Sequence, residues 1–249
     1  MKIALIACAA FCVTYAGGLF ALRLHDKLHL VLGFSAGAVV AVGLVDLIPE
    51  AISLGSDYHT PATLLTWTTL SFVLYLLLDR IQLLHSHAAH HHEHDVDHTT
   101  VPAAGGRVAM GAGSFSAHSF LDGVAIGVAF QASTTVGTIV TIAVLTHDFS
   151  DGINTVNVVV KNGGSRRQAR LWLLADALAP AIGVGSTLLF TMPQDLMGTA
   201  LAIFAGFFIY IGASDLIPES YHAHPKFLTT AMTLLGAGVI CIVVHVASI

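Results

Sequence analysis

Two stretches of the chain repeat a pairing of histidine with aspartate that could bind a metal ion. One runs from His118 to Asp122 and reads H-S-F-L-D-G, and the other runs from His147 to Asp151 and reads H-D-F-S-D-G. In each stretch the two residues are four positions apart, so a helix would present them on one face. Two such helices could together form a His₂Asp₂ cluster, or a His₂Asp₃ cluster that includes Asp148.

A cluster of this kind could neutralise a divalent cation and replace its bound water. Imidazole nitrogens and carboxylate oxygens suit Zn²⁺, Fe²⁺, Mn²⁺, Co²⁺ or Cd²⁺ better than Cu(I), which prefers sulfur. The middle of neither stretch contains a lysine or arginine, so the acids would repel one another without a cation. Two other interpretations stay open at this point: histidine–aspartate hydrogen bonds that only pack the helices, and a proton relay without metal.

The composition indicates that these helices lie in a membrane. Of the 249 residues, 55% are hydrophobic and only 10% are charged, and the mean hydropathy is +0.79. Soluble proteins carry about 25% charged residues, so the composition argues against a soluble enzyme. It excludes disorder over most of the chain. The net charge of −5 with ten cations argues against nucleic acid as a partner. The three cysteines lie in apolar runs without a CxxC motif and predict no disulfide framework.

The sequence predicts an all-α membrane protein with eight transmembrane helices, in a single transporter domain spanning residues 1–249. A helix needs about 20 mostly apolar residues to cross a bilayer. The first apolar run is interpreted as a span, with a cleaved signal peptide as the alternative, because it ends at Arg23 and Lys27 without a cleavage site. The eight expected spans are 3–22, 31–52, 63–84, 108–130, 135–160, 170–190, 197–218 and 227–247.

The distribution of cations predicts the orientation. With eight spans, nine of the ten lysines and arginines fall on one side, and only Lys2 falls on the other. Cytoplasmic loops are enriched in such residues. We therefore expect a multi-pass protein of the plasma or inner membrane with both termini outside. The nine are Arg23, Lys27, Arg80, Arg107, Lys161, Arg166, Arg167, Arg170 and Lys226.

A five-residue repeat, D-L-I-P-E, stands near the ends of the second and seventh spans. The copies are an odd number of spans apart, which places them at opposite membrane faces and indicates an inverted repeat. Their acids could line the outer and inner mouths of a cation path, or could serve as interfacial anchors. The second copy is followed by two histidines, which are either part of an exit station with its glutamate or ordinary loop residues. These mouth candidates are Asp46, Glu50, Asp215, Glu219, His222 and His224.

Residues 85–104 are predicted to form a histidine-rich, flexible cytoplasmic loop. Interleaved acids make the segment too polar to fold alone, and clustered imidazoles bind divalent transition metals. It could capture or sense metal, or serve as a solvated spacer. The seven histidines are His85, His87, His90, His91, His92, His94 and His98.

On these features the chain resembles the ZIP family of zinc- and iron-type divalent metal transporters, most specifically in its two H-x-x-x-[DE]-G segments. The resemblance implies a 3+2+3 arrangement in which spans 1–3 and 6–8 are inverted repeats. It also implies metal movement towards the cytoplasm through a site, often binuclear, between spans 4 and 5 with help from span 6.

The resemblance assigns five ligands on the two central spans: His118, Asp122, His147, Asp148 and Asp151. Ser119 stands where the family often has asparagine, and is a weaker candidate ligand. In span 6 the family commonly has glutamate before a proline, but here Ala179 precedes Pro180. The nearest acid, Asp176, lies one turn earlier and is either a substitute ligand or a helix-packing residue.

The predicted function is import of divalent transition metal ions, with Zn²⁺ the first candidate and Fe²⁺, Mn²⁺ and Cd²⁺ as others. The absence of a GxxxxGK[ST] motif argues against primary pumping. The expected partners are the metal ions and the lipid bilayer, and a homodimer is an open alternative for the assembly. The rival interpretation is an intramembrane zinc-dependent hydrolase, in which two histidines and an aspartate hold the metal and another aspartate acts as general base.

Overall fold

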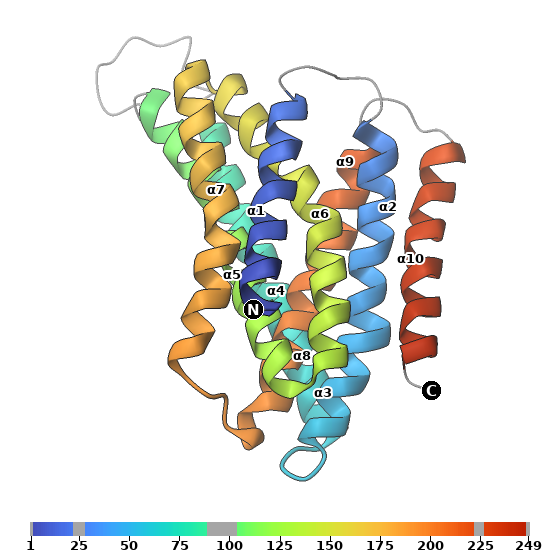
Figure 1. The fold of residues 1–249 in the computed structure, drawn as a ribbon. Coiled ribbons are helices and arrows are strands. Elements are labelled where there is room, and N and C mark those ends of the chain that lie inside the picture. Colours follow the sequence, from blue (N-terminus) through green and yellow to red (C-terminus); the bar gives the residue numbers. More distant parts are fainter. Residues whose placement is uncertain (1, 22–27, 89–103, 222–226, 248–249) are drawn as a thin grey trace.

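The structure, a computed structural model, describes residues 2–21, 28–88, 104–221 and 227–247. These residues form helices and contain no strand (Figure 1). The helices are α1 (Lys2–Ala21), α2 (Leu28–Ala41), η1 (Val42–Leu47), α3 (Ile48–Gly55), α4 (Pro61–Ala88), α5 (Ala104–Ala132), α6 (Thr134–Lys161), α7 (Arg166–Ser186), η2 (Thr187–Leu189), α8 (Gln194–Tyr210), η3 (Ile211–Leu216), α9 (Ile217–Tyr221) and α10 (Phe227–Ala247). Here η1 and η3 are π-helices and η2 is a 3₁₀ turn.

Six helical segments in the described part of the chain are long and apolar enough to cross a membrane. The all-helical class is therefore confirmed, whereas the count of eight spans stays a prediction. Helices α5 and α6 are not among the six, although they contain 29 and 28 residues. They carry the polar residues of the two histidine–aspartate stretches, which lower their hydropathy. The six segments are Ala4–Ala21, Leu30–Gly55, Pro61–Leu78, Arg166–Leu189, Gln194–Tyr221 and Phe227–Val246.

The boundaries of the histidine-rich segment differ from the expectation. Helix α4 continues to Ala88, so the backbone of residues 85–88, including His85 and His87, is helical. The next helix begins at Ala104. The other five histidines of the segment, and likewise His222 and His224, lie outside the described residues.

The helices pack as two groups. Helices α1, α5, α6 and α7 contact one another, chiefly as the pairs α1–α6 and α5–α7. Helices α2, α4, α8 and α10 form the other group, chiefly through α2–α10 and α4–α8. The groups meet where α2 packs on α6 and α8 packs on α5. The pair α1–α6 corresponds to α7–α5, and the pair α4–α8 corresponds to α10–α2, which is compatible with an inverted repeat.

Both copies of the D-L-I-P-E sequence occupy the same local structure. Each begins inside a π-helix and leaves it at the isoleucine, Ile48 in η1–α3 and Ile217 in η3–α9. The N–H of each isoleucine donates to the carbonyl of a glycine five residues earlier, at the wider spacing of a π-helix. The following proline has no N–H to donate. Helices α3 and α9 lie at opposite ends of the bundle (Figure 1).

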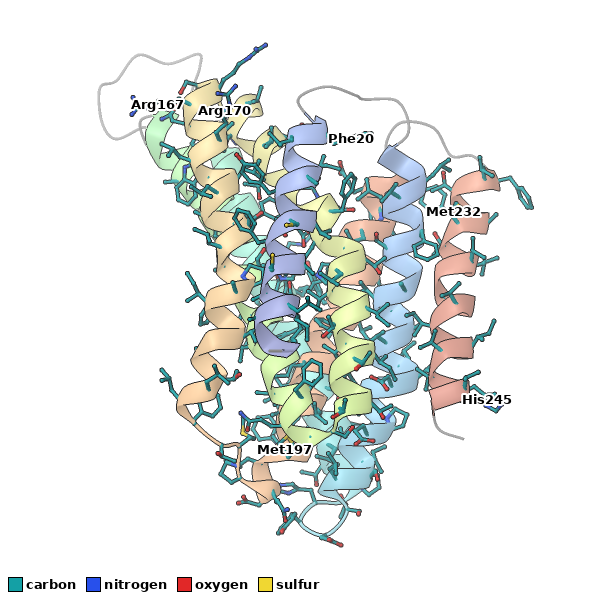
Figure 2. The ribbon with its side chains drawn as sticks, viewed as in Figure 1. Phe20, Arg167, Arg170, Met197, Met232 and His245 are labelled. Carbon is teal, nitrogen blue, oxygen red and sulfur yellow. The ribbon has the colours of Figure 1, made fainter. Side chains whose placement is uncertain are left out.

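One end of the bundle carries exposed arginines. Arg167 and Arg170 stand at the start of α7, and Met197 of α8 lies near the other end (Figure 2). The N-terminus of α7 is closed by a capping box, in which the side chains and backbone of Ser165 and Gln168 exchange hydrogen bonds. The helix therefore begins sharply next to its cations, at the end that the charge distribution assigns to the cytoplasm.

Each of the two histidine–aspartate stretches ends in a glycine that allows a neighbouring helix to approach. A Cβ atom on Gly152 of α6 would clash with the backbone carbonyl of Thr14 on α1. A Cβ atom on Gly123 of α5 would clash in the same way with the carbonyl of Pro180 on α7. Small residues at such crossings allow helices in membranes to pack backbone to backbone. The glycines thus explain the last position of the two motifs.

We predict that Gly152→Ala destabilises the protein because the α1–α6 crossing has no room for a methyl group. The expected cost is about 1–3 kcal/mol, the usual range for overpacking a core, measured as a lower midpoint of thermal unfolding in detergent. The matched control is Gly185→Ala, since a Cβ there meets nothing within 4 Å. Equal midpoints for the two variants would contradict the packing role.

Candidate metal centre

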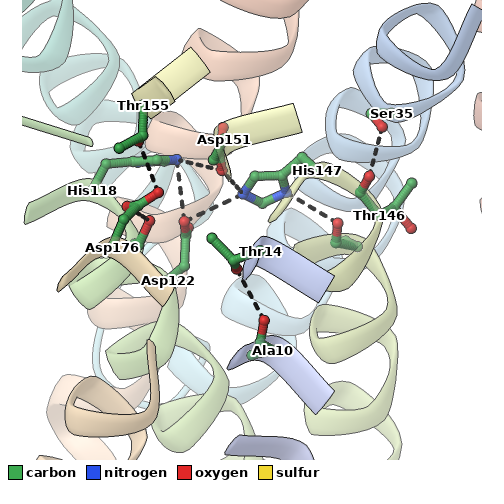
Figure 3. A network of polar contacts seen from close by, with 12 residues as sticks. Ala10, Thr14, Ser35, His118, Asp122, Thr146, His147, Asp151, Thr155 and Asp176 are labelled. Carbon is green, nitrogen blue, oxygen red and sulfur yellow. Dashed lines mark hydrogen bonds and ion pairs between the residues drawn. The ribbon is translucent and has the colours of Figure 1, made fainter. Parts of the chain in front are cut away.

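Four side chains from α5 and α6 converge in the interior of the protein. His118 and Asp122 come from α5, and His147 and Asp151 come from α6 (Figure 3). One ligand atom from each lies within 4.8 Å of all the others. The four residues are only 8%, 2%, 0% and 3% exposed, in that order. The convergence that the i, i+4 spacing predicts is therefore present for these four residues.

The four nitrogen–oxygen distances within this group are close to those between the ligands of a tetrahedral metal ion. Asp122 Oδ2 lies 3.1 Å from Nε2 of His118 and 3.2 Å from Nε2 of His147. Asp151 Oδ2 lies 3.8 Å and 3.7 Å from the same two nitrogens. Zinc binds nitrogen and oxygen at about 2.0–2.1 Å, which makes the edge of its ligand tetrahedron about 3.3–3.4 Å. The observed distances bracket that edge.

The hydrogen bonding of His147 favours a positive charge at this group. Nδ1 of His147 lies 3.0 Å from the carbonyl oxygen of Ala143, which can only accept, so Nδ1 carries a proton. In the neutral ring the other nitrogen, Nε2, then presents a lone pair to the carboxylate of Asp122. Two acceptors at 3.2 Å are unfavourable unless a metal ion lies between them or the ring gains a second proton. The arrangement is thus prepared for a positive charge.

A second polar group lies beside the first and joins three helices. Asp176 of α7 is fully buried, and its two carboxylate oxygens each accept a hydrogen bond of 2.8 Å. The donors are the hydroxyls of Ser119 on α5 and Thr155 on α6. Asp176 and Ser119 are not among the four converging residues. In this structure they bond to each other and tie α7 to the helices that carry the ligands.

Asp148 occupies a different position from the other acids of the two motifs. It is fully buried, and it is not part of the group of four. Neither of its oxygens has a hydrogen-bond partner in the described part of the structure. Its assignment as a ligand stays a prediction.

The mouth candidates lie on other helices than the four converging residues. Asp46 is buried within η1, and its Oδ2 has no hydrogen-bond partner among the described residues. Glu50 follows one turn later in α3 and is half-buried. Asp215 lies in η3 and Glu219 in α9, where the glutamate is half-buried. Their place in a cation path stays a prediction.

Sequence reasoning did not find two residues that contact the site. Thr155 was detectable, because it lies four residues after Asp151 and so continues the same helix face. Tyr75 was not, because it lies 43 residues before His118 on another helix. Its hydroxyl is 3.2 Å from Nδ1 of His118.

Comparison with known sequences identifies the family. A family model described as ZIP Zinc transporter matches residues 80–244, about two thirds of the chain and both histidine–aspartate stretches. The chain belongs to the ZIP zinc transporter family. The resemblance read from the two motifs is thereby confirmed. Because this is a family of transporters, the ZIP assignment speaks against the hydrolase alternative.

Curated relatives of this ZIP family chain are named zinc transporters. Zinc transporter foi of Drosophila melanogaster is 30% identical over 137 residues, which is 55% of this chain and 19% of that protein. Zinc transporter ZIP10 of Mus musculus is 33% identical over 149 residues, with 55% and 16% covered. Zinc transporter zipt-7.2 of Caenorhabditis elegans is 37% identical over 108 residues, with 41% and 23% covered. The alignments thus span less than a quarter of each relative.

We predict that Asp151→Asn weakens zinc binding by the purified protein by more than about a hundredfold. Removing a partner of a ligand costs 10–100-fold in affinity, and removing a charged ligand costs more. The dissociation constant is measured by competition with a chromophoric chelator. Asp195→Asn is the control, because Asp195 is exposed at the start of α8. An unchanged constant for Asp151→Asn would contradict its role as a ligand.

Proposed function

We propose that this chain transports Zn²⁺ across a membrane into the cytoplasm through one site formed by His118, Asp122, His147 and Asp151. The observation that carries the proposal is the convergence of two imidazoles and two carboxylates in the buried interior, with one ligand atom from each within 4.8 Å of all the others. Two neutral imidazoles and two carboxylates carry a charge of −2, which balances a divalent cation. In a buried site an unbalanced charge is costly, so the group favours a dication over an empty state.

The same ligands support transport over hydrolysis. A catalytic zinc site keeps one coordination position open for water or substrate. Here four protein side chains offer ligand atoms within 4.8 Å of one another, enough to supply all four positions of a tetrahedral site. A transporter also needs stations between its central site and the two membrane faces. Asp46 with Glu50, and Asp215 with Glu219, could provide them, since α3 and α9 lie at opposite ends of the bundle (Figure 1).

The proposed membrane arrangement has eight spans in the 3+2+3 order, with both termini outside. It is supported by the collection of cations on one side, by the matched packing of α1–α6 with α7–α5, and by the two π-helices. In this orientation a membrane potential that is negative inside favours inward movement of a +2 ion. The protein would alternate access around the central site.

Zinc is the proposed substrate because the relatives are named for it and because two imidazoles with two carboxylates fit its tetrahedral preference. Fe²⁺, Mn²⁺ and Cd²⁺ share much of this ligand chemistry and are the competitors to compare with it. The histidines of residues 85–98 would capture the ion on the cytoplasmic side.

The test is zinc uptake into proteoliposomes that contain a metal-sensitive dye. We expect saturable uptake by the wild type and its loss in the Asp122→Ala, Asp151→Ala double variant, because the double variant removes both carboxylates of the four-residue group. Asp195→Ala is the control and should retain uptake. Correct folding of each variant is verified by its elution and melting profile in detergent.

Two outcomes would overturn the proposal. Uptake by the double variant at the wild-type rate would place the path elsewhere. A wild type that retains one tightly bound zinc ion but shows no flux would favour the fixed site of a hydrolase.

We further predict that Asp46→Asn raises the zinc concentration needed for half-maximal uptake several-fold. The carboxylate of Asp46 is buried, and its Oδ2 has no hydrogen-bond partner among the described residues, so it would attract the ion before the ion reaches the centre. Zinc affinity of the central site, measured by chelator competition, should not change. Asp57→Asn, in the exposed turn before α4, serves as the control. Unaltered uptake kinetics for Asp46→Asn would remove it from the path.

A further inference from the structure

The two histidines of the metal centre are oriented by partners of different kinds. Nδ1 of His147 bonds to the carbonyl of Ala143, which belongs to the same helix and lies one turn earlier. Nδ1 of His118 instead faces the hydroxyl of Tyr75 at 3.2 Å, and the two rings meet edge to face with centroids 6.1 Å apart. The orientation of His118 therefore depends on a side chain from another helix.

That helix, α4, belongs to the other packing group. It packs mainly on α8 and contacts α5 only lightly. The Tyr75 ring lies against two aromatic residues of α8, with centroids 5.0 Å from Tyr210 and 5.6 Å from Phe207. These contacts hold the ring of Tyr75 from one side, while its hydroxyl reaches across to the ligand of the other group.

The hydroxyl of Tyr75 can determine which nitrogen of His118 is free to bind a metal ion. Nε2 of His118 is the atom directed at Asp122 and Asp151, at 3.1 Å and 3.8 Å. It can bind a metal only if the ring proton resides on Nδ1. The Tyr75 oxygen can accept that proton in a hydrogen bond. Metal-binding histidines commonly donate their other N–H to such a partner, which fixes both tautomer and ring orientation.

We propose that Tyr75 is a positioning residue for the metal centre: its hydroxyl accepts the Nδ1–H of His118 and thereby directs Nε2 towards the ion. This inference rests on the proposed function, since it concerns the same site. The consequence is that zinc affinity depends on α4 and on its contact with α5. His147 carries its acceptor on its own helix and does not share this dependence.

The test is Tyr75→Phe, which removes the hydroxyl and keeps the ring that packs on α8. We expect the zinc dissociation constant of the purified, full-length protein to rise about 10–100-fold, the usual cost of losing a ligand's outer partner. Tyr15→Phe is the matched control, because Tyr15 lies on α1 and stacks on Phe11, with ring centroids 5.6 Å apart. Its dissociation constant should equal that of the wild type.

A double-mutant cycle separates positioning from general damage to the fold. If Tyr75 acts through His118, then Tyr75→Phe has no further effect on zinc affinity in a His118→Ala background. A loss of the same size in that background would show a merely structural role and overturn the inference.

A spectroscopic measurement adds a readout that packing alone would not change. In zinc-loaded wild-type protein with ¹⁵N-labelled histidine, assigned by comparison with His118→Gln, the inference requires that Nε2 of His118 binds the metal and that Nδ1 carries a hydrogen-bonded proton. Tyr75→Phe should weaken that hydrogen bond, which is measured as an upfield shift of the Nδ1 proton. A wild-type spectrum in which Nδ1 of His118 binds the metal would overturn the inference even if the Phe variant did not fold.

The outcomes distinguish this inference from the proposed function. A wild type that neither binds nor transports zinc would overturn both. A wild type that binds and transports zinc, with the same affinity in Tyr75→Phe, would overturn only the role of Tyr75.

Discussion

The structure depends on two carboxylates, Asp122 and Asp151, that face the same two histidines inside an apolar helix bundle. Asp122 and Asp151 are almost completely buried, and the residues between and beside them on their helices include no lysine or arginine. Charges in such surroundings need a counter-charge close by, because the medium screens them poorly. The two imidazoles supply ligand atoms but, when neutral, no compensating charge. In the proposed site a divalent cation would supply the missing positive charge.

The proposed sharing of one ion would require the central helices to pack closely. Helices α5 and α6 must bring a histidine and an aspartate each within a few ångströms, and glycines at Gly123 and Gly152 let α7 and α1 pack directly behind them. Asp176 adds a polar tie, since it accepts a hydrogen bond from each ligand-bearing helix. The same turns, residues 118–123 of α5 and 147–152 of α6, thus determine both the helix packing and the positions of the four converging side chains. Of these four helices, only α5 and α6 carry the four converging residues.

Several features followed from the sequence because they are local. The i, i+4 spacing within each motif places His118 with Asp122 and His147 with Asp151 on one helix face, whatever the surroundings. Long apolar runs predicted helices of membrane-spanning length, although the polar residues of α5 and α6 weaken that signal in the two most important helices. The repeat of Asp46–Glu50 at 215–219 pointed to corresponding structure, and both copies do leave a π-helix at the same residue.

Other features required the tertiary structure, because they join residues that are distant in sequence. The sequence left Asp176 as either a ligand or a packing residue, and only the fold showed two hydroxyls bonded to its carboxylate. Likewise, nothing near Tyr75 in the sequence points to His118, since the contact exists only where α4 passes α5. The sequence by itself determined which residues share a helix face and that the chain belongs in a membrane. The fold decided which faces meet, and so which side chain bonds to Nδ1 of His118, because that contact joins two helices.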